Sequence, residues 1–94
     1  MVTVLIPAAL RPDSGGERRL DLPVGAGTLA AVLDQLAAGW PRLHRRLRDE
    51  QGQLRRYVNI YVDGEDCRRV GGLATPVPAD AEVQILPSVA GGSG

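Results

Sequence analysis

The chain has 94 residues, which suits one compact domain, and its formal net charge of zero disfavours generic binding to nucleic acid or anionic lipid. All eleven cationic residues are Arg, so Schiff-base lysines and a phosphate-loop lysine are excluded. Cys67 is the only cysteine, which excludes an intrachain disulfide and a secreted, disulfide-stapled scaffold.

The first elements read as a β-hairpin. Val2 to Ile6 is a β-branched run stopped by Pro7, which predicts a strand. This opening is too short and too uncharged for a signal peptide or a membrane span, so we expect a cytoplasmic protein without a membrane segment. Pro12 to Gly16 is a turn-forming cluster, and Arg18 to Leu22 alternates as the return strand would.

The middle of the chain predicts two helices. Thr28 is the expected N-cap of the first helix and Gly39 its end. Pro41 is expected to open a second, shorter helix with Leu43 and Leu47 facing inward. The first helix carries its apolar stripe at Leu29, Val32, Leu33, Leu36 and Ala37, and the second is expected to point Arg42, Arg45, Arg46 and Arg48 outward.

The last third of the chain returns to strand patterns. Val58 to Val62 alternates and runs into the turn dipeptide Asp63-Gly64. A short strand is expected at Cys67 to Val70, a loop at Gly71 to Asp80, and a final strand at Glu82 to Leu86 that ends at Pro87. The order predicts an α+β domain over residues 1–87, with one main helix packed across a mixed sheet, followed by a flexible tail over 88–94.

A search for catalytic or metal-binding groups finds little. His44, the only histidine, lies among arginines and is interpreted as a solvated polar residue rather than a general base. Cys67 is interpreted as a small, partly buried residue without a role. One His and one Cys cannot form a closed zinc site. No motif supports a triad with Ser14, Ser88 or Ser93, so we expect no catalytic residue, no metal and no bound cofactor.

Arginines cluster between the second helix and the following strand. They form either a solvated helix face, partly neutralised by Asp49 and Glu50, or a docking face. Because no aromatic residues are interleaved for base stacking, an acidic protein partner is favoured over nucleic acid. The cluster comprises Arg42, Arg45, Arg46, Arg48, Arg55 and Arg56.

The C-terminal segment is rich in glycine. Such an end is by default a frayed tail or an addition to the protein. Here it follows directly from a predicted core strand, so it would form a flexible arm with a carboxylate at its tip. Glycine has no Cβ and therefore fits a narrow channel in a partner. The segment reads Pro87, Ser88, Val89, Ala90, Gly91, Gly92, Ser93 and Gly94.

Three segments together resemble the ThiS/MoaD family of ubiquitin-like sulfur-carrier proteins. They are Tyr57 to Asp66, Gly71 to Thr75, and Val83 to Gly92. Ile6-Pro7, Leu10 to Pro12 and Gly15-Gly16 are similar to the branch that serves cysteine synthesis. The resemblance spans nearly the whole chain.

This resemblance implies a β-grasp fold and a carrier that is not itself an enzyme. Gly92 would be the site of adenylation and thiocarboxylate formation, and Pro87, Ser88, Val89, Ala90 and Gly91 would thread the partner's channel. The implied partners are an adenylating enzyme of the ubiquitin-activating type, which uses ATP, and a sulfur-accepting synthase. The product could be cysteine or another sulfur-containing metabolite or cofactor.

The chain departs from the family pattern at its end. Active carriers of this family end at the Gly-Gly pair, whereas Ser93 and Gly94 follow it here. The two residues are either a precursor extension, removed by a zinc metalloprotease of the deubiquitinase type, or an addition. A ubiquitin-like adaptor that only binds partners through its sheet remains the alternative function, and it would not need Gly-Gly.

Overall fold

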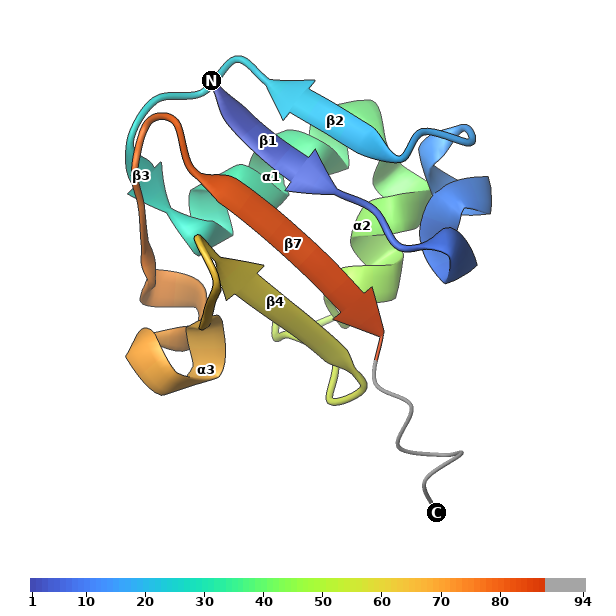
Figure 1. The fold of residues 1–94 in the computed structure, drawn as a ribbon. Helices are drawn as coiled ribbons and strands as arrows, with labels where there is room; N and C mark the ends of the chain where they lie inside the picture. The colour runs from blue at the N-terminus through green and yellow to red at the C-terminus, as the bar shows by residue number, and fades with distance from the viewer. Residues whose placement is uncertain (88–94) are drawn as a thin grey trace.

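The computed structural model describes residues 1–87, and the predicted tail over 88–94 lies outside that range. A five-stranded mixed sheet forms one layer, with the strand order β2-β1-β7-β4-β5 (Figure 1). β1 and β7 run parallel at its centre, and the other neighbours are antiparallel. The strands are β1 Val2–Leu5, β2 Arg19–Leu22, β4 Val58–Val62, β5 Glu65–Asp66 and β7 Glu82–Pro87.

The predicted hairpin forms from β1 and β2. Each strand is one residue shorter than predicted, yet the Ile6 amide still donates to the Arg18 carbonyl at 2.7 Å. The turn cluster belongs to a longer connection, the 3-10 helix η1 at Ala8–Ser14. Gly15 and Gly16 then take φ values of 70° and 85°, a left-handed conformation that glycine adopts without steric cost.

The helices cover one face of the sheet. α1 spans Leu29–Gly39, and the Thr28 hydroxyl accepts a hydrogen bond from the Ala31 amide at 3.2 Å, which confirms the predicted N-cap. α2 spans Pro41–Leu47, and both helices lie behind the sheet in Figure 1. None of the helices within residues 1–87 has the length and apolar character that crossing a membrane requires.

The core lies between α1, α2 and the sheet, as the apolar pattern predicts. Its helical members are fully or almost fully buried, except that Ala37 is only half-buried. The buried side chains of the predicted sheet face and helix stripe are Val2, Val4, Ile6, Leu29, Val32, Leu33, Leu36, Leu43, Leu47, Val58, Ile60, Val62, Val83 and Ile85.

The predicted short strand at Cys67–Val70 is wrong, because this segment is the helix α3. The Asp66 carboxylate accepts from the Arg68 amide at 3.0 Å and so starts a helical turn directly after the hairpin. The next segment is also more ordered than the predicted loop. It contains the 3-10 helix η2 at Gly72–Ala74 and the strand β6 at Pro76–Val77, which pairs with β3 at Gly27–Thr28.

Candidate functional site

The C-terminal strand β7 is the central strand of the sheet. It pairs with β1 only as far as the Leu5–Gln84 partners, whereas its pairing with β4 continues to Val58 and Pro87. In the part of the chain that the structure describes, the end of β7 is therefore paired with β4 alone. Pro87, at this end of β7, is the last residue that the structure describes (Figure 1).

The residues predicted to carry the chemistry lie beyond Pro87 in the sequence. Gly92 and the channel residues Ser88, Val89, Ala90 and Gly91 are outside the part of the chain that the structure describes. Pro87 is the last residue of β7. The structure thus fixes where the tail begins.

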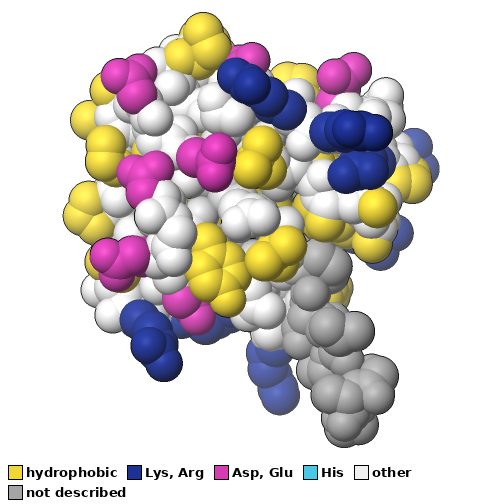
Figure 2. Space-filling view, in the orientation of Figure 1, with side chains coloured by type: hydrophobic (Ala, Val, Ile, Leu, Met, Phe, Trp, Pro, Cys, Tyr) yellow, Lys and Arg dark blue, Asp and Glu magenta, His cyan; other side chains and the backbone are white. Residues whose placement is uncertain are grey.

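The sheet face opposite the helices is open and carries a mixture of side chains. Figure 2 views this face and shows hydrophobic side chains interspersed with charged ones. Leu86 is 38% exposed on this face and is the second-to-last residue of β7. A hollow of about 290 Å³ adjoins it, and the side chains that line it include Leu5, Pro7, Arg11, Arg18 and Gln84. The hollow is thus lined by apolar and cationic side chains, while the face as a whole also carries acidic ones (Figure 2), and such a mixed surface is suited to contact with another protein.

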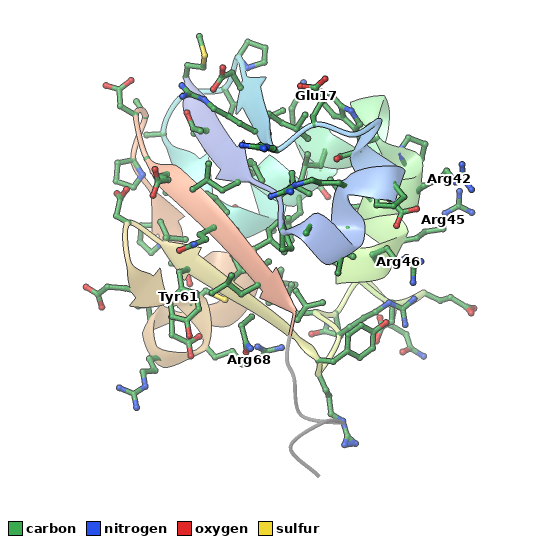
Figure 3. All side chains as sticks on the ribbon, turned by 45° about the vertical axis from the view of Figure 1, so that its right-hand side comes forward. Glu17, Arg42, Arg45, Arg46, Tyr61 and Arg68 are labelled. Atoms are coloured by element: carbon green, nitrogen blue, oxygen red, sulfur yellow. The ribbon has the colours of Figure 1, made fainter. Side chains whose placement is uncertain are left out.

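Arg68 connects α3 to the start of β4, the strand that pairs with the end of β7 (Figure 3). Its guanidinium donates to the Val58 carbonyl at 2.6 Å and to the Arg55 carbonyl at 2.8 Å. No motif in the sequence singles out Arg68, and the strand predicted at Cys67 to Val70 would have placed it in a sheet. Asp66 ahead of it was the available signal for a capped helix.

The other candidate side chains are dispersed. His44 lies on α2, whereas Cys67 is fully buried at the start of α3. Burial raises the pKa of the Cys67 thiol, which keeps it protonated and unreactive. The Ser14 hydroxyl is buried within hydrogen-bond distance of two backbone carbonyls, those of Arg11 and Glu17. Among residues 1–87 no group of three His, Cys, Asp or Glu side chains is placed to hold a metal ion.

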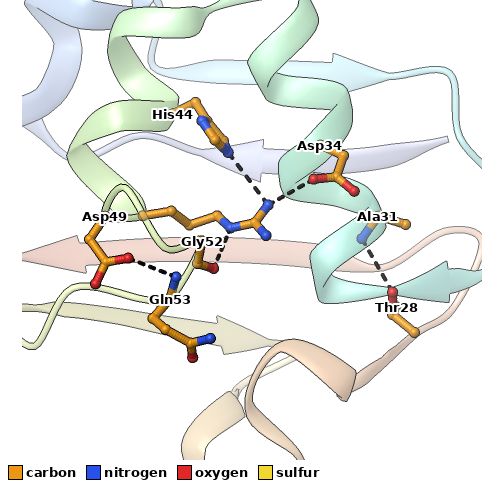
Figure 4. Close-up of polar contacts among 8 residues, drawn as sticks. Thr28, Ala31, Asp34, His44, Asp49, Gly52 and Gln53 are labelled. Atoms are coloured by element: carbon orange, nitrogen blue, oxygen red, sulfur yellow. Dashed lines mark hydrogen bonds and ion pairs between the residues drawn. The ribbon is translucent and has the colours of Figure 1, made fainter.

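The arginines of α2 largely face outward, as predicted (Figure 3). Arg46 pairs with Asp13 at 3.0 Å, which ties α2 to η1. Arg48 does not follow the prediction, since its side chain is only 14% exposed and donates to Asp34 on α1 at 2.8 Å (Figure 4). It follows α2 as the C-cap residue in an extended conformation, and that geometry turns its side chain back toward α1.

Comparison with known proteins agrees with this architecture. The sequence model of the ThiS family matches residues 4–92. A sulfur carrier protein CysO of Mycobacterium tuberculosis is 46% identical over 93 residues, which cover 97% of this chain and 98% of the relative. The crystal structure of M. tuberculosis CysO superposes with a TM-score of 0.85 at 44% identity, covering 95% of this chain and 100% of that one.

A second solved structure adds a protein partner. A chain from the crystal structure of the Amycolatopsis orientalis BexX/CysO complex has a TM-score of 0.86 at 35% identity and covers 95% of this chain and 97% of its own. These matches and the mixed sheet define a ubiquitin-like β-grasp protein of the carrier type, which is not an enzyme. The chain belongs to the ThiS family, and within it the chain is similar to the CysO proteins. The resemblance seen in the sequence is confirmed.

Proposed function

We propose that this protein carries sulfur as a thiocarboxylate on Gly92, formed after adenylation of the Gly92 carboxylate. The observation that carries the proposal is the extent of the family match, which runs to Gly92 and leaves Ser93 and Gly94 outside. The position of β7 supports it, because the tail follows directly from the central strand of the five-stranded sheet. The carrier name of the relatives supports the same role.

The proposed chemistry uses groups supplied by partners. A Gly92 carboxylate oxygen attacks the α-phosphorus of ATP, a C–O–P linkage forms, and pyrophosphate leaves. Hydrosulfide then attacks the acyl carbon, a C–S bond forms, the C–O bond to the phosphate breaks, and AMP leaves. In this proposal the adenylating enzyme of the ubiquitin-activating type binds the ATP, and the chemistry requires no cofactor bound to this chain.

Activation requires a free carboxylate on Gly92. In the 94-residue chain the Gly92 carbonyl belongs to a peptide bond with Ser93. Hydrolysis of that bond by a zinc metalloprotease would release Ser93-Gly94 and expose the carboxylate. The thiocarboxylate would then donate its sulfur to a synthase, which we propose acts in cysteine synthesis or in the synthesis of another sulfur metabolite.

The open sheet face supplies the proposed docking surface for these partners. It is uncovered by helices and adjoins the point where the tail departs. The sheet would hold the enzyme while the tail reaches the active site, so that binding energy from the sheet positions the carboxylate. The solved BexX/CysO complex, in which a similar chain is present with a protein partner, supports this proposal.

Pyrophosphate release tests the adenylation step. The chain ending at Gly92 is incubated with ATP and an adenylating enzyme from the same organism, without a sulfur donor. We expect release that depends on the chain and that is absent with the 94-residue form. Equal release from both forms would contradict the proposed precursor.

A further inference from the structure

Arg68 joins α3 to the segment that precedes and begins β4. Its Nη2 donates to the Arg55 carbonyl at 2.8 Å, and its Nη1 donates to the Val58 carbonyl at 2.6 Å. Nη1 also lies 3.3 Å from the Asn59 side-chain oxygen. One planar guanidinium thus holds three acceptors along five residues of chain, which a single ammonium could not do with the same geometry.

The hydrogen-bond pattern between β4 and β7 explains why the Val58 carbonyl is free to accept a hydrogen bond from Arg68. The Asp63 amide donates to the Glu82 carbonyl at 2.9 Å, so the hydrogen-bonded pairs of this antiparallel ladder fall at every second residue from there. By this alternation Asn59 and Leu86 form a hydrogen-bonded pair, whereas the Val58 carbonyl points away from β7. β5 pairs with β4 only opposite Tyr61 and Val62, so Arg68 occupies the uncovered edge at Val58.

The segment before β4 is also tied to α2. The Arg55 amide donates to the Leu47 carbonyl at 3.0 Å, and the Arg55 Nε donates to the Arg45 carbonyl at 2.8 Å. The Val58 amide donates to the Arg55 carbonyl at 3.1 Å, which closes the turn that Arg68 clamps. The start of β4 is therefore fixed from α2 on one side and from α3 on the other.

Within residues 1–87, this fixed segment is the only strand partner at the end of β7. Asn59 is paired with Leu86 and Val58 with Pro87, after the pairing with β1 has ended at Gln84. We propose that Arg68 is a positioning residue that fixes the end of β7, the strand from which the C-terminal segment continues. The proposal rests on the proposed function, since only an arm that must reach a distant active site needs a fixed origin.

The first test is independent of sulfur chemistry. Backbone amide exchange is compared between the wild type, Arg68→Gln and the control Arg69→Gln. Arg69 is the next residue and is exposed, as Arg68 is, but its side chain forms no hydrogen bond or ion pair within residues 1–87. In Arg68→Gln we expect exchange at Asn59 and Leu86 to rise about tenfold, while the amide of Tyr61, the next hydrogen-bonded position of β4 in this ladder, stays protected. Unchanged exchange at both residues would overturn the proposal.

The second test measures activation kinetics on chains that end at Gly92. For Arg68→Gln we expect kcat of adenylation to fall about tenfold while KM changes by less than about twofold, because the open face is intact. Arg68→Lys keeps the charge but loses the fork and should lie between. It also serves as the test variant if Arg68→Gln does not fold. A parallel thermal melt separates loss of folded protein from loss of positioning.

The outcomes separate the two proposals. A wild-type chain that is never adenylated overturns the proposed function and the positioning role with it. A wild-type chain that is adenylated, with kcat unchanged in both Arg68 variants or reduced only in proportion to the unfolded fraction, overturns the positioning role alone. A kcat loss in Arg69→Gln equal to that in Arg68→Gln would also overturn it.

Discussion

Arg48 and Asp34 connect the C-terminal end of α2 to α1 through a contact of 2.8 Å between Nη1 and Oδ1. The Arg48 Nε also donates to the Gly52 carbonyl at 2.8 Å, so the same side chain holds the loop that follows the helix (Figure 4). Asp34 is 70% exposed, which limits the worth of the ion pair itself. The helix-to-loop junction depends on Arg48 remaining in this position.

His44 makes this junction sensitive to pH. Burial lowers the pKa of the His44 imidazole, and the nearby Arg48 charge lowers it further, against a smaller opposite effect from Asp34. The unfolded chain, with a usual His pKa of about 6.5, then binds the proton more readily than the folded chain. Stability that is present above about pH 6.5 should fall as the pH drops through that value toward the lower folded pKa.

The measurement is the urea midpoint between pH 7.5 and 5 for the wild type and for His44→Gln. We expect the wild-type midpoint to fall across this range and the His44→Gln midpoint to fall less. Parallel curves for the two proteins would show that His44 does not titrate differently in the folded and unfolded states.

Leu33 tests the packing of α1 on the sheet. Its side chain is fully buried, so Leu33→Ala should lower the free energy of unfolding by ~2–5 kcal/mol. Gln35→Ala, at an exposed position of the same helix, should change it by less than about 0.5 kcal/mol. Urea denaturation measures both values. A loss below about 0.5 kcal/mol for Leu33→Ala would contradict its place in the core.

Much of this fold could be predicted because apolar periodicity and turn residues act locally. The stripe of α1, its Thr28 cap and the alternation in β4 each specify one element with one buried face. The strand prediction at Cys67–Val70 was wrong because a continued β-hairpin and a capped helical turn are both compatible with so short a segment. The N-cap at Asp66 favours the helix. The prediction that Arg48 points outward was wrong because its orientation depends on Asp34 in α1, and this contact cannot be read from the pattern of α2 alone.

The candidate site, too, could be predicted only in part from the sequence. Gly92 was identified from a resemblance, since a glycine-rich end has no periodicity that indicates a function. The role of Arg68 depends on long-range pairing between β4 and β7, and a pattern read along one segment does not contain that pairing.

Gly92 itself tests the need for an unhindered tail. Replacing Gly92 by Ala, in a chain that ends there, adds a Cβ that should obstruct the partner's channel. We expect adenylation to slow by about tenfold or more, with the free energy of unfolding changed by less than about 0.5 kcal/mol. Pyrophosphate release and urea denaturation measure the two effects.

The matched control is Gly25→Ala, where an added Cβ meets no atom within 4 Å. This variant should be adenylated at the wild-type rate. A wild-type adenylation rate in Gly92→Ala would show that the channel tolerates a side chain. An equal loss of adenylation in Gly92→Ala and Gly25→Ala would show that the effect is not specific to the tail.

The most direct test of the central claim is the intact mass of the carrier after incubation with ATP, hydrosulfide and an adenylating enzyme from the same organism. The chain ending at Gly92 should gain the mass difference between one sulfur and one oxygen, only when ATP is present. The 94-residue chain should stay unchanged until Ser93 and Gly94 are removed. Thiocarboxylation of the 94-residue chain on Gly94 as readily as the shorter chain on Gly92 would contradict the precursor, and failure of both forms would contradict the sulfur-carrier mechanism.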